Sequence, residues 1–439
     1  MSETAVLVDA RAESKDPFEF LLNVTRRYGD AVRYDGQTGP TYLFNHPRFV
    51  KEVLQNPRFQ RTSMIKLALG DGLLASDGDY WRKQRQLVQS LFHSDAVTTF
   101  EPIIQSHMRV MLDRWAEHAE RGESLDVSAE MTLLTLSIIV DALFGVELGP
   151  RTRDLTRALM VLLDDLGAMG CTQLNTPLTF SASSRERFQT AMRTVDEVVA
   201  TIIEKRRRVG VDRVNFMSVL LGARDGQTGK HLTDRQIRDE VVSMLIAGHE
   251  TTAMVLSWSW SLLATNPSVE QSLHREVDRV LGARTPKLED LGNLPYTVMV
   301  LQESMRLYPP VWFIARKATS AGDVGGVDVP ENVLVIVSPF AIHRHPDFWN
   351  SPDDFNPTRF SAGNQQAKHS YIPFGAGRHL CLGMHLALME GSLLLAGFAQ
   401  RYVVRPASER IRLHPAITLR LRDGLMAAIH EREAQKADT

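Results

Sequence analysis

The feature that most constrains the fold is one long helical pattern at residues 232–267, LTDRQIRDEVVSMLIAGHETTAMVLSWSWSLLATNP. The pattern opens with Thr233-Asp234-Arg235-Gln236, which has the form of a capping box, and it stops at Asn266-Pro267. Roughly 30 residues of helix measure about 45 Å at 1.5 Å per residue. Because this helix is apolar on most of its faces, we expect it to cross the centre of a large domain.

The other segments predict further helices and a few short strands. Apolar residues at spacings of three and four predict helices over residues 86–120 and 183–208. The strand-like segments are residues 31–36, 40–45, 332–337 and 416–422. Since no repeat, low-complexity tract or linker divides the chain, we predict one mainly α domain with small β-sheets over residues 1–439, and not the three domains that length alone suggests. Residues 1–20 are expected to form a flexible N-terminal segment.

Composition and charge exclude several classes of protein. Hydrophobic residues make up 44% and charged residues 23%, so a large core can form. The net charge of −2 gives no reason to expect nucleic acid or an anionic membrane as a partner. The two cysteines, Cys171 and Cys381, make no disulfide framework and indicate a reducing compartment. The N-terminus has no signal-peptide pattern, and apolar stretches such as residues 133–140 fall far short of the ~20 residues that span a bilayer. We therefore expect a cytoplasmic, monomeric protein.

The surroundings of Cys381 are unusual for a lone cysteine. It lies in FGAGRHLCLG (374–383), where three glycines allow tight turns, and a helical pattern follows it. Free N–H groups and the helix dipole stabilise a thiolate at a helix N-terminus. Arg378 and His379 add positive potential. This segment therefore predicts a persistent thiolate.

Three kinds of chemistry would use such a thiolate. A zinc site needs about four ligands, usually with a CxxC or HxxxH partner, and the sequence has neither. A nucleophilic cysteine needs a base, and His379 is so close in the chain that the two side chains rarely face each other. The remaining candidate is an axial ligand to haem iron.

FGAGRHLCLG resembles the haem-ligand loop of the cytochrome P450 monooxygenases, Phe-Gly-x-Gly-x-x-x-Cys-x-Gly. Further landmarks in the family's order extend the resemblance from about residue 30 to the C-terminus. The resemblance implies the cytochrome P450 fold, a triangular helical domain around a long central helix. It also implies haem b, with Cys381 as the iron ligand and with Phe374 and Gly375 beside the thiolate.

The segment WRKQR (81–85) resembles the WxxxR of the family's third helix. Trp81 and Arg85 lie at i and i+4, so both can hold one haem propionate. The resemblance places Arg316 and His379 at the propionates as well.

AGHETT (247–252) lies in the middle of the long helical pattern. Gly248 leaves room against the helix, and Thr251 can donate a hydrogen bond to the carbonyl of Ala247, which opens a pocket for O2. In the family, an acid and an alcohol such as Glu250 and Thr251 form the catalytic proton relay.

ESMR (303–306), followed later by FNPTRF (355–360), resembles the family's buried Glu–Arg–Arg network. Glu303 and Arg306 are one helical turn apart and can pair bidentately, and Arg359 would be the third member. The resemblance implies that this network has a structural role, since it fixes the loop that carries Cys381. Where the family often has Pro-x-Gly this chain has Asn332, and asparagine can adopt the turn conformation that glycine supplies.

The resemblance implies a monooxygenase that inserts one atom of O2 into a hydrophobic small molecule by hydroxylation or epoxidation. A secondary metabolite such as a polyketide or terpenoid is the expected substrate, and a fatty-acid hydroxylase or a thiolate-haem enzyme that does not use O2 are the alternatives. The expected pocket residues are mostly apolar. They are Leu69, Leu73, Leu74, Met244, Ala247, Val311, Trp312, Phe313 and Ile417.

The chain shows no flavin-binding or ferredoxin-cluster motif. Electrons would therefore come from NAD(P)H through a ferredoxin or flavodoxin partner. That partner is expected to dock on the thiolate side, where Arg82, Lys83 and Arg378 should lie.

Overall fold

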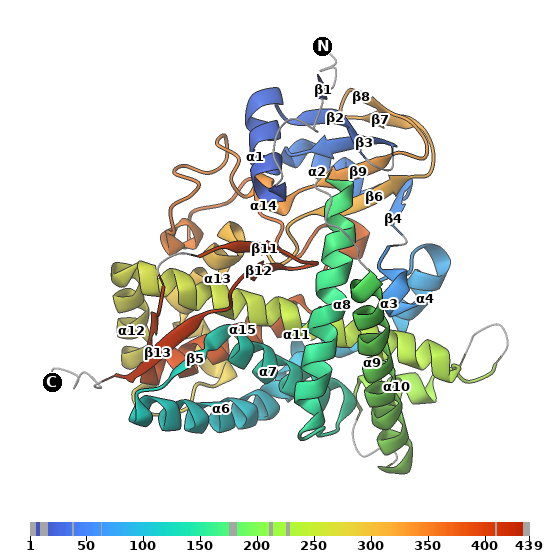
Figure 1. The fold of residues 1–439 in the computed structure, drawn as a ribbon. Coiled ribbons are helices and arrows are strands. Elements are labelled where there is room, and N and C mark those ends of the chain that lie inside the picture. The colour runs from blue at the N-terminus through green and yellow to red at the C-terminus, as the bar shows by residue number, and fades with distance from the viewer. Residues whose placement is uncertain are drawn as a thin grey trace.

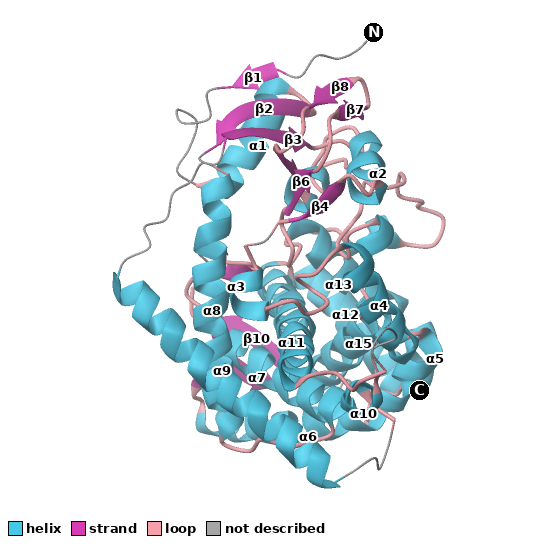
Figure 2. Ribbon diagram, turned by 90° about the vertical axis from the view of Figure 1, so that its right-hand side faces the viewer, coloured by secondary structure: helices cyan, strands magenta, loops and turns pink. Residues whose placement is uncertain are grey.

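The computed structural model describes residues 6–8, 16–36, 39–62, 64–174, 182–209, 214–224, 229–408 and 411–432. Figure 1 shows a mostly helical body with its largest sheet at one end, and Figure 2 shows the same division from the side. The predicted mainly α fold with small sheets is confirmed. Most of the N-terminal segment proposed to be flexible lies outside the described residues.

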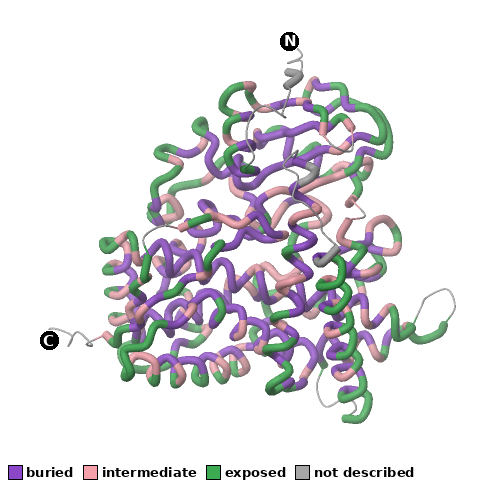
Figure 3. The backbone as a smooth tube through the Cα atoms, in the orientation of Figure 1, coloured by how far each residue is buried: buried purple, intermediate pink, exposed green. Residues whose placement is uncertain are grey.

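Helix α11 (Asp234–Thr265) is the 32-residue helix expected at the centre. Its capping box is present, with Thr233 N bonded to Gln236 Oε1 at 2.9 Å and Gln236 N to Thr233 Oγ1 at 3.3 Å. Helices α7 (Val127–Ile139), α13 (Pro295–Leu307) and α15 (Met384–Arg401) pack around it. Figure 2 shows α11 nearly end-on among its neighbours, and Figure 3 shows that the buried backbone follows this central region.

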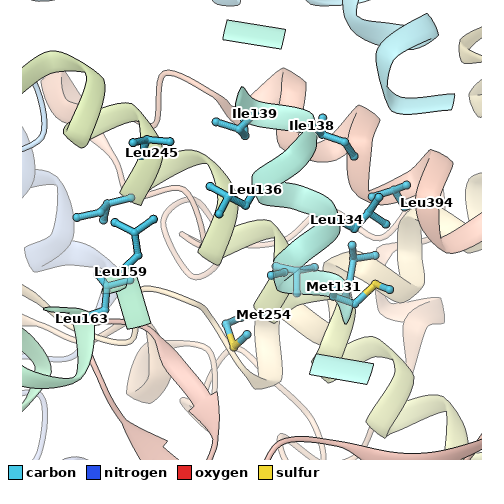
Figure 4. Close-up of a cluster of buried hydrophobic side chains, with 14 of the residues drawn as sticks. Met131, Leu134, Leu136, Ile138, Ile139, Leu159, Leu163, Leu245, Met254 and Leu394 are labelled. Carbon is cyan, nitrogen blue, oxygen red and sulfur yellow. The ribbon is translucent and has the colours of Figure 1, made fainter. Parts of the chain in front are cut away.

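Most of the side chains that α7 buries in the core are apolar. Figure 4 shows Met131, Leu134 and Leu136 of α7 inserted between side chains of neighbouring helices, among them Leu245 of α11. The segment Val127–Phe144 is long and apolar enough to cross a membrane. The shorter apolar stretches considered in the sequence, such as residues 133–140, did not predict this. In this protein 78% of that segment is buried, so it serves as a core helix.

The remaining helices surround this core. They are α1 (Pro17–Tyr28), α2 (Pro47–Gln55), α3 (Lys66–Leu69), α4 (Gly78–Val88), α5 (Ser94–Val97), α6 (Glu101–Arg121), α8 (Arg151–Gln173), α9 (Ala182–Val209), α10 (Phe216–Gly222), α12 (Pro267–Leu281) and α14 (Pro339–Ile342).

Four sheets are present in the described residues. The largest has the order β1-β2-β3-β9-β6-β4, and the others are β10-β13-β5, β11-β12 and β7-β8. The strands are β1 (Val6–Val8), β2 (Ala31–Gly36), β3 (Gly39–Phe44), β4 (Phe59–Arg61), β5 (Ser124–Asp126), β6 (Ile314–Ala318), β7 (Gly322–Val324), β8 (Val327–Val329), β9 (Leu334–Val337), β10 (Tyr402–Pro406), β11 (Leu413–Pro415), β12 (Leu419–Leu421) and β13 (Met426–Glu431).

Two predicted elements are wrong in extent. The helix expected over residues 86–120 is interrupted between Val88 and Glu101, where the chain forms short helical turns. Pro102 has no N–H and lies in the first turn of a new helix, α6. The strand expected over residues 416–422 is only β12, since residues 416–418 form the turn of a hairpin with β11. Asn332 has a φ of 65°, which is the glycine-like conformation predicted for it.

Candidate active site

A cavity of about 400 Å³ lies between α11 and the loop that precedes α15. Cys381 forms part of its wall on the loop side, and Ala247, Gly248 and Thr251 form part of its wall on the α11 side. Most of the remaining lining is apolar. The structure thus brings the cysteine loop and the threonine of α11 to one enclosed space.

The loop that carries Cys381 turns back on itself. The amide of Cys381 donates to the carbonyl of Phe374 at 3.0 Å, and Phe374 and Gly375 line the cavity beside it. Gly377 has a φ of 72°, and a Cβ there would lie 2.3 Å from the carbonyl oxygen of Leu54. Because only glycine fits such a position, the packing of this loop against α2 depends on Gly377.

The electrostatics of Cys381 differ from the expectation. Burial raises the pKa of the Cys381 thiol, and the amide of Gly383 and the guanidinium of Arg85 offset this only in part. The chain alone therefore holds a thiol, and the expected persistent thiolate requires a bound metal ion, which deprotonates a coordinated thiol.

Three arginines line the cavity together: Arg61 on β4, Arg85 on α4 and Arg316 on β6. We call them the arginine cluster. Arg61 and Arg316 are directly opposite each other in the β4–β6 pairing. Burial lowers the pKa of Arg61 to about 9 and that of Arg316 to about 10, and the proximity of other arginines contributes to both shifts. The cluster is therefore a buried site with an excess of positive charge.

Trp81 and His379 lie beside this cluster, with ring centroids 4.3 Å apart. Burial lowers the pKa of His379 to about 4, so its ring is neutral at pH 7 and does not add the positive charge expected from the sequence. Its Nδ1 is buried without a hydrogen-bond partner in the described part of the chain. The nearby acid is Asp77: burial raises its pKa, but hydrogen bonds from His379 and from the amides of Arg61 and Gly78 outweigh this and hold it well below its usual range.

This arrangement fits haem. Two propionate carboxylates would offset two of the three positive charges of the arginine cluster and supply an acceptor for His379. The apolar walls suit the porphyrin faces, and Cys381 is accessible from the cavity, as an axial ligand must be. Haem bound in this cavity would have Cys381 as its candidate iron ligand and Trp81, Arg85, Arg316, His379 and Arg61 as its candidate contacts at the propionates.

The wall formed by α11 contains the expected hydrogen bond, since Thr251 Oγ1 donates to the carbonyl of Ala247 at 2.9 Å. Gly248 has an additional role in packing. A Cβ at Gly248 would lie 2.9 Å from Cδ1 of Ile139, so the missing side chain lets α7 approach α11 closely. Ile139 itself lines the cavity.

The structure does not bring Glu250 and Thr251 together. Glu250 is fully buried, does not line the cavity, and pairs with Nε of Arg420 on β12. Arg420 also donates from Nη1 to Asp164 of α8 at 2.6 Å. Successive residues of a helix point in different directions, so the carboxyl of Glu250 and the hydroxyl of Thr251 lie on different faces. The two side chains therefore have separate hydrogen-bond partners, and the proton relay expected of Glu250 and Thr251 stays a prediction.

Glu303, Arg306 and Arg359 form the predicted network. Arg306 donates from Nε and Nη2 to the two carboxylate oxygens of Glu303 at 2.7 and 2.8 Å, and Arg359 Nε donates to Glu303 Oε1 at 3.1 Å. Arg306 Nη1 also donates to the carbonyl of His343 at 2.9 Å, and Nε2 of His343 accepts from the amide of Ile372 at 2.8 Å. A chain of hydrogen bonds thus runs from α13 to the segment directly before the cysteine loop.

Most of the predicted pocket residues line the cavity. They are Leu73, Leu74, Met244, Ala247, Val311, Phe313 and Ile417. Leu69 and Trp312 are corrections, since both are buried in the core outside the lining. The indole of Trp312 points to the hairpin, where its Nε1 donates to the carbonyl of Ala416 at 3.0 Å.

No local sequence pattern indicated several of the lining residues. Arg61 is the most important of them, and its position follows from a strand pairing that no local pattern predicts. The apolar lining residues that were not predicted come from segments that read as ordinary core. They include Met64, Ile65, Phe92, Ile139, Leu143 and Val255.

A cysteine that is exposed to an arginine-lined apolar cavity beneath a long central helix is typical of a haem-thiolate protein. A family model described as Cytochrome P450 matches residues 6–421, and the chain belongs to the cytochrome P450 family. Haem, the use of O2, a hydrophobic substrate and an external redox partner follow from this membership.

Comparisons with individual proteins agree. The chain is 32% identical to "Cyclooctatin synthase" of Streptomyces melanosporofaciens over 416 residues, which cover 92% of this chain and 90% of that protein. It is 33% identical to "Cyclooctat-9-en-7-ol 5-monooxygenase" of the same organism over 397 residues, which cover 89% of this chain and 85% of that protein. Its fold is similar to the crystal structure of the cytochrome P450DA heme domain, with a TM-score of 0.87, 24% identity and 99% coverage of both chains.

Proposed function

We propose that this cytochrome P450 monooxygenase inserts one atom of O2 into a terpenoid by hydroxylation or epoxidation. The observation that carries the proposal is the apolar cavity between Cys381 and Thr251. Two relatives with names that refer to cyclooctatin and to cyclooctat-9-en-7-ol support a terpenoid among hydrophobic substrates. A polyketide has the same apolar character and remains the second candidate.

A fatty acid is a weaker candidate. Among the described lining residues, the arginines are those of the arginine cluster, and the proposed propionates occupy them. A fatty acid would therefore find no separate cation for its carboxylate. A neutral apolar molecule fits the rest of the lining better.

The residues of the chain have distinct tasks in this reaction. When bound, haem with a thiolate ligand supplies the activation of O2, one atom of which enters the substrate while the other leaves as water. Thr251 holds a hydroxyl at the cavity wall, where it can pass protons. Apolar side chains exclude bulk water and position the substrate.

Electrons are proposed to come from NAD(P)H through a ferredoxin or flavodoxin. Arg82 and Lys83 are exposed on α4, where an acidic partner could bind, although Arg82 is paired with Asp79. Arg378 does not join them, because it turns inward to Asp77 at 3.2 Å. The proposed docking patch is therefore smaller than the sequence suggested.

A spin-state titration tests the proposed substrate. The purified ferric protein would be mixed with polycyclic terpenoid alcohols, macrocyclic polyketides and fatty acids while the Soret band is recorded. We expect a shift to high spin with the terpenoids, because a substrate that fills the cavity displaces water from the iron. A shift with fatty acids alone would contradict the proposal, and a shift with polyketides alone would replace terpenoid by polyketide.

Thr251→Ala should raise the share of consumed O2 that leaves as hydrogen peroxide about tenfold or more, since a positioned acid–base group contributes ~10²–10⁴-fold. Substrate binding should change little, because the substitution removes only the hydroxyl and one methyl group. The measurement is the ratio of peroxide to product with a surrogate ferredoxin pair. The matched control is Thr252→Ala at the neighbouring lining residue. Equal ratios in wild type and Thr251→Ala would show that protons arrive by another route.

A further inference from the structure

Asp239 and Glu240 form a buried acidic pair in the first half of α11. Their exposed fractions are only 5% and 1%. Asp239 Oδ2 accepts from the amide of Asp71 at 3.0 Å, and Glu240 Oε2 accepts from the amide of Leu73 at 3.0 Å. Burying a carboxyl group is costly unless it is hydrogen-bonded. The amides of Asp71 and Leu73 therefore stabilise the buried pair, and the pair in turn holds these two amides in place.

Residues 70–76, which we call the lid loop, lie directly on α11. A Cβ at Gly70 would be 2.2 Å from Asp239 Oδ2. A Cβ at Gly72 would be 2.2 Å from both the backbone carbonyl oxygen of Asp239 and Oγ of Ser243. The two glycines thus allow the backbone of the lid loop to contact the helix without intervening side chains.

The lid loop is also held from the side of the cofactor cavity. Arg61 Nη1 donates to the carbonyls of Leu73 at 2.6 Å and of Leu74 at 2.8 Å. Leu73 is therefore fixed at both of its backbone groups, by Glu240 at its N–H and by Arg61 at its C=O. The side chains of Leu73 and Leu74 line the cavity, so this clamp sets the position of one wall.

We propose that Glu240 is a positioning residue, which fixes the lid loop over the cavity and so determines how tightly bulky ligands bind. The inference rests on the proposed function only in taking this cavity as the substrate site. Glu240 neither lines the cavity nor belongs to the cysteine loop, the arginine cluster or the Glu303 network.

The clamp should respond to pH. Burial raises the pKa of Glu240 to about 7, the negative charge of Asp239 adds to the shift, and the amide of Leu73 opposes it. The other charged or titratable groups nearby are Arg238, Asp71 and Tyr80, and Arg238 is bonded to both Asp239 and Asp196.

The sign of the pH effect follows from solvation. When the lid loop lifts, Glu240 meets water and its pKa falls towards its ordinary value. A group whose pKa is raised in the closed state stabilises that state at low pH, and this contribution is lost as the pH rises towards about 7. Bulky ligands should therefore bind more tightly near about pH 6 than near about pH 8.

Spectral titration of the ferric holoenzyme with two iron ligands tests the clamp. Clotrimazole fills the cavity with its triphenylmethyl group, whereas imidazole is too small to contact the lid loop. Glu240→Ala should weaken clotrimazole binding about tenfold, the effect of one lost hydrogen bond, and imidazole binding by less than about twofold. Glu240→Gln keeps an acceptor for Leu73, so it should retain the affinity. It should lose only the part of the pH dependence that Glu240 contributes, which is obtained after the protonation of the azole ligand itself is subtracted in both proteins.

Glu276→Ala is the matched control. Glu276 is a buried acid on α12 that accepts from the amides of Tyr296 and Thr297 at 2.7 and 2.8 Å and does not line the cavity. It should affect stability without selective loss of clotrimazole. Equal weakening of both ligands in Glu240→Ala, or an unchanged pH profile in Glu240→Gln, would overturn the proposal.

Two further measurements keep the inference independent of folding and of the proposed function. If Glu240→Ala does not fold, Gly72→Ala should give the same selective loss, and an unchanged affinity there would count against the clamp. If wild type shows no haem spectrum, the proposed function fails. Amide hydrogen exchange of residues 70–76, compared between proteins at the same pH, then tests the clamp alone. Glu240→Gln cannot ionise, so it should exchange like wild type at low pH and more slowly than wild type at high pH, whereas Glu240→Ala should exchange faster than wild type at every pH. Exchange in Glu240→Ala equal to wild type would overturn the clamp.

Discussion

Cys381→Ala is expected to abolish the thiolate-haem absorption spectrum and to reduce oxygenase activity to background. Alanine has no donor atom in its side chain, so haem bound in this cavity would lack the thiolate that gives the spectrum. The arginine cluster would still attract the propionates, so some haem is expected to bind without the thiolate signature. Absorption spectra of the ferric and ferrous–carbonyl forms measure this directly.

Cys171→Ala is the control for this substitution. Cys171 is buried at the end of α8, where its sulphur contacts the carbonyl of Pro415 at 3.5 Å, and it does not line the cavity. Its loss should leave the thiolate spectrum intact. A thiolate spectrum that survives Cys381→Ala but disappears in Cys171→Ala would reverse the assignment of the iron ligand.

Arg306→Ala should reduce the free energy of unfolding by about 3–5 kcal/mol, the usual effect of removing one partner from a buried ion pair. Both Arg306 and Glu303 are fully buried. The substitution leaves the charge of Glu303 without its bidentate partner and removes the donor to the carbonyls of His343, Pro352 and Asp354. Denaturant unfolding followed by circular dichroism gives the change in free energy, and haem content gives the effect on the cysteine loop.

Arg412→Ala is the control for this substitution, because Arg412 forms an ion pair of similar geometry at the surface. Arg412 donates to both carboxylate oxygens of Asp423 at 2.9 and 2.8 Å, but their side chains are 64% and 58% exposed. Water screens this pair, so its loss should cost about 0–1 kcal/mol. Similar losses in both variants would mean that burial does not determine the importance of the Glu303–Arg306 pair.

Features with local causes could be predicted from the sequence. The limits of α11 follow from Thr233, Gln236 and Pro267, all of which act within one turn of a helix end. The Glu303–Arg306 pair follows from a spacing of three on one helix face. The bond from Thr251 to Ala247 follows in the same way from a spacing of four.

Features that depend on distant parts of the chain could not be predicted. The ion pair that holds Glu250 depends on Arg420, which lies 170 residues later in the chain. Arg61 reaches the cavity because β4 pairs with β6, which is far away in sequence. Trp312 lies between the lining residues Val311 and Phe313. Its indole nevertheless packs in the core, because Nε1 donates to the carbonyl of Ala416 on the β11–β12 hairpin.

The β11–β12 hairpin links two properties of the enzyme, its substrate specificity and the fraction of electrons that reach product. Its turn places Ile417 in the cavity, and three residues later Arg420 holds the acid of α11. A substitution that reshapes the hairpin to accept a new substrate will also shift the partner of Glu250. Changes of specificity through this hairpin should therefore be accompanied by changes in the fraction of electrons that reach product, whereas changes at Val311 or Phe313 should alter specificity alone.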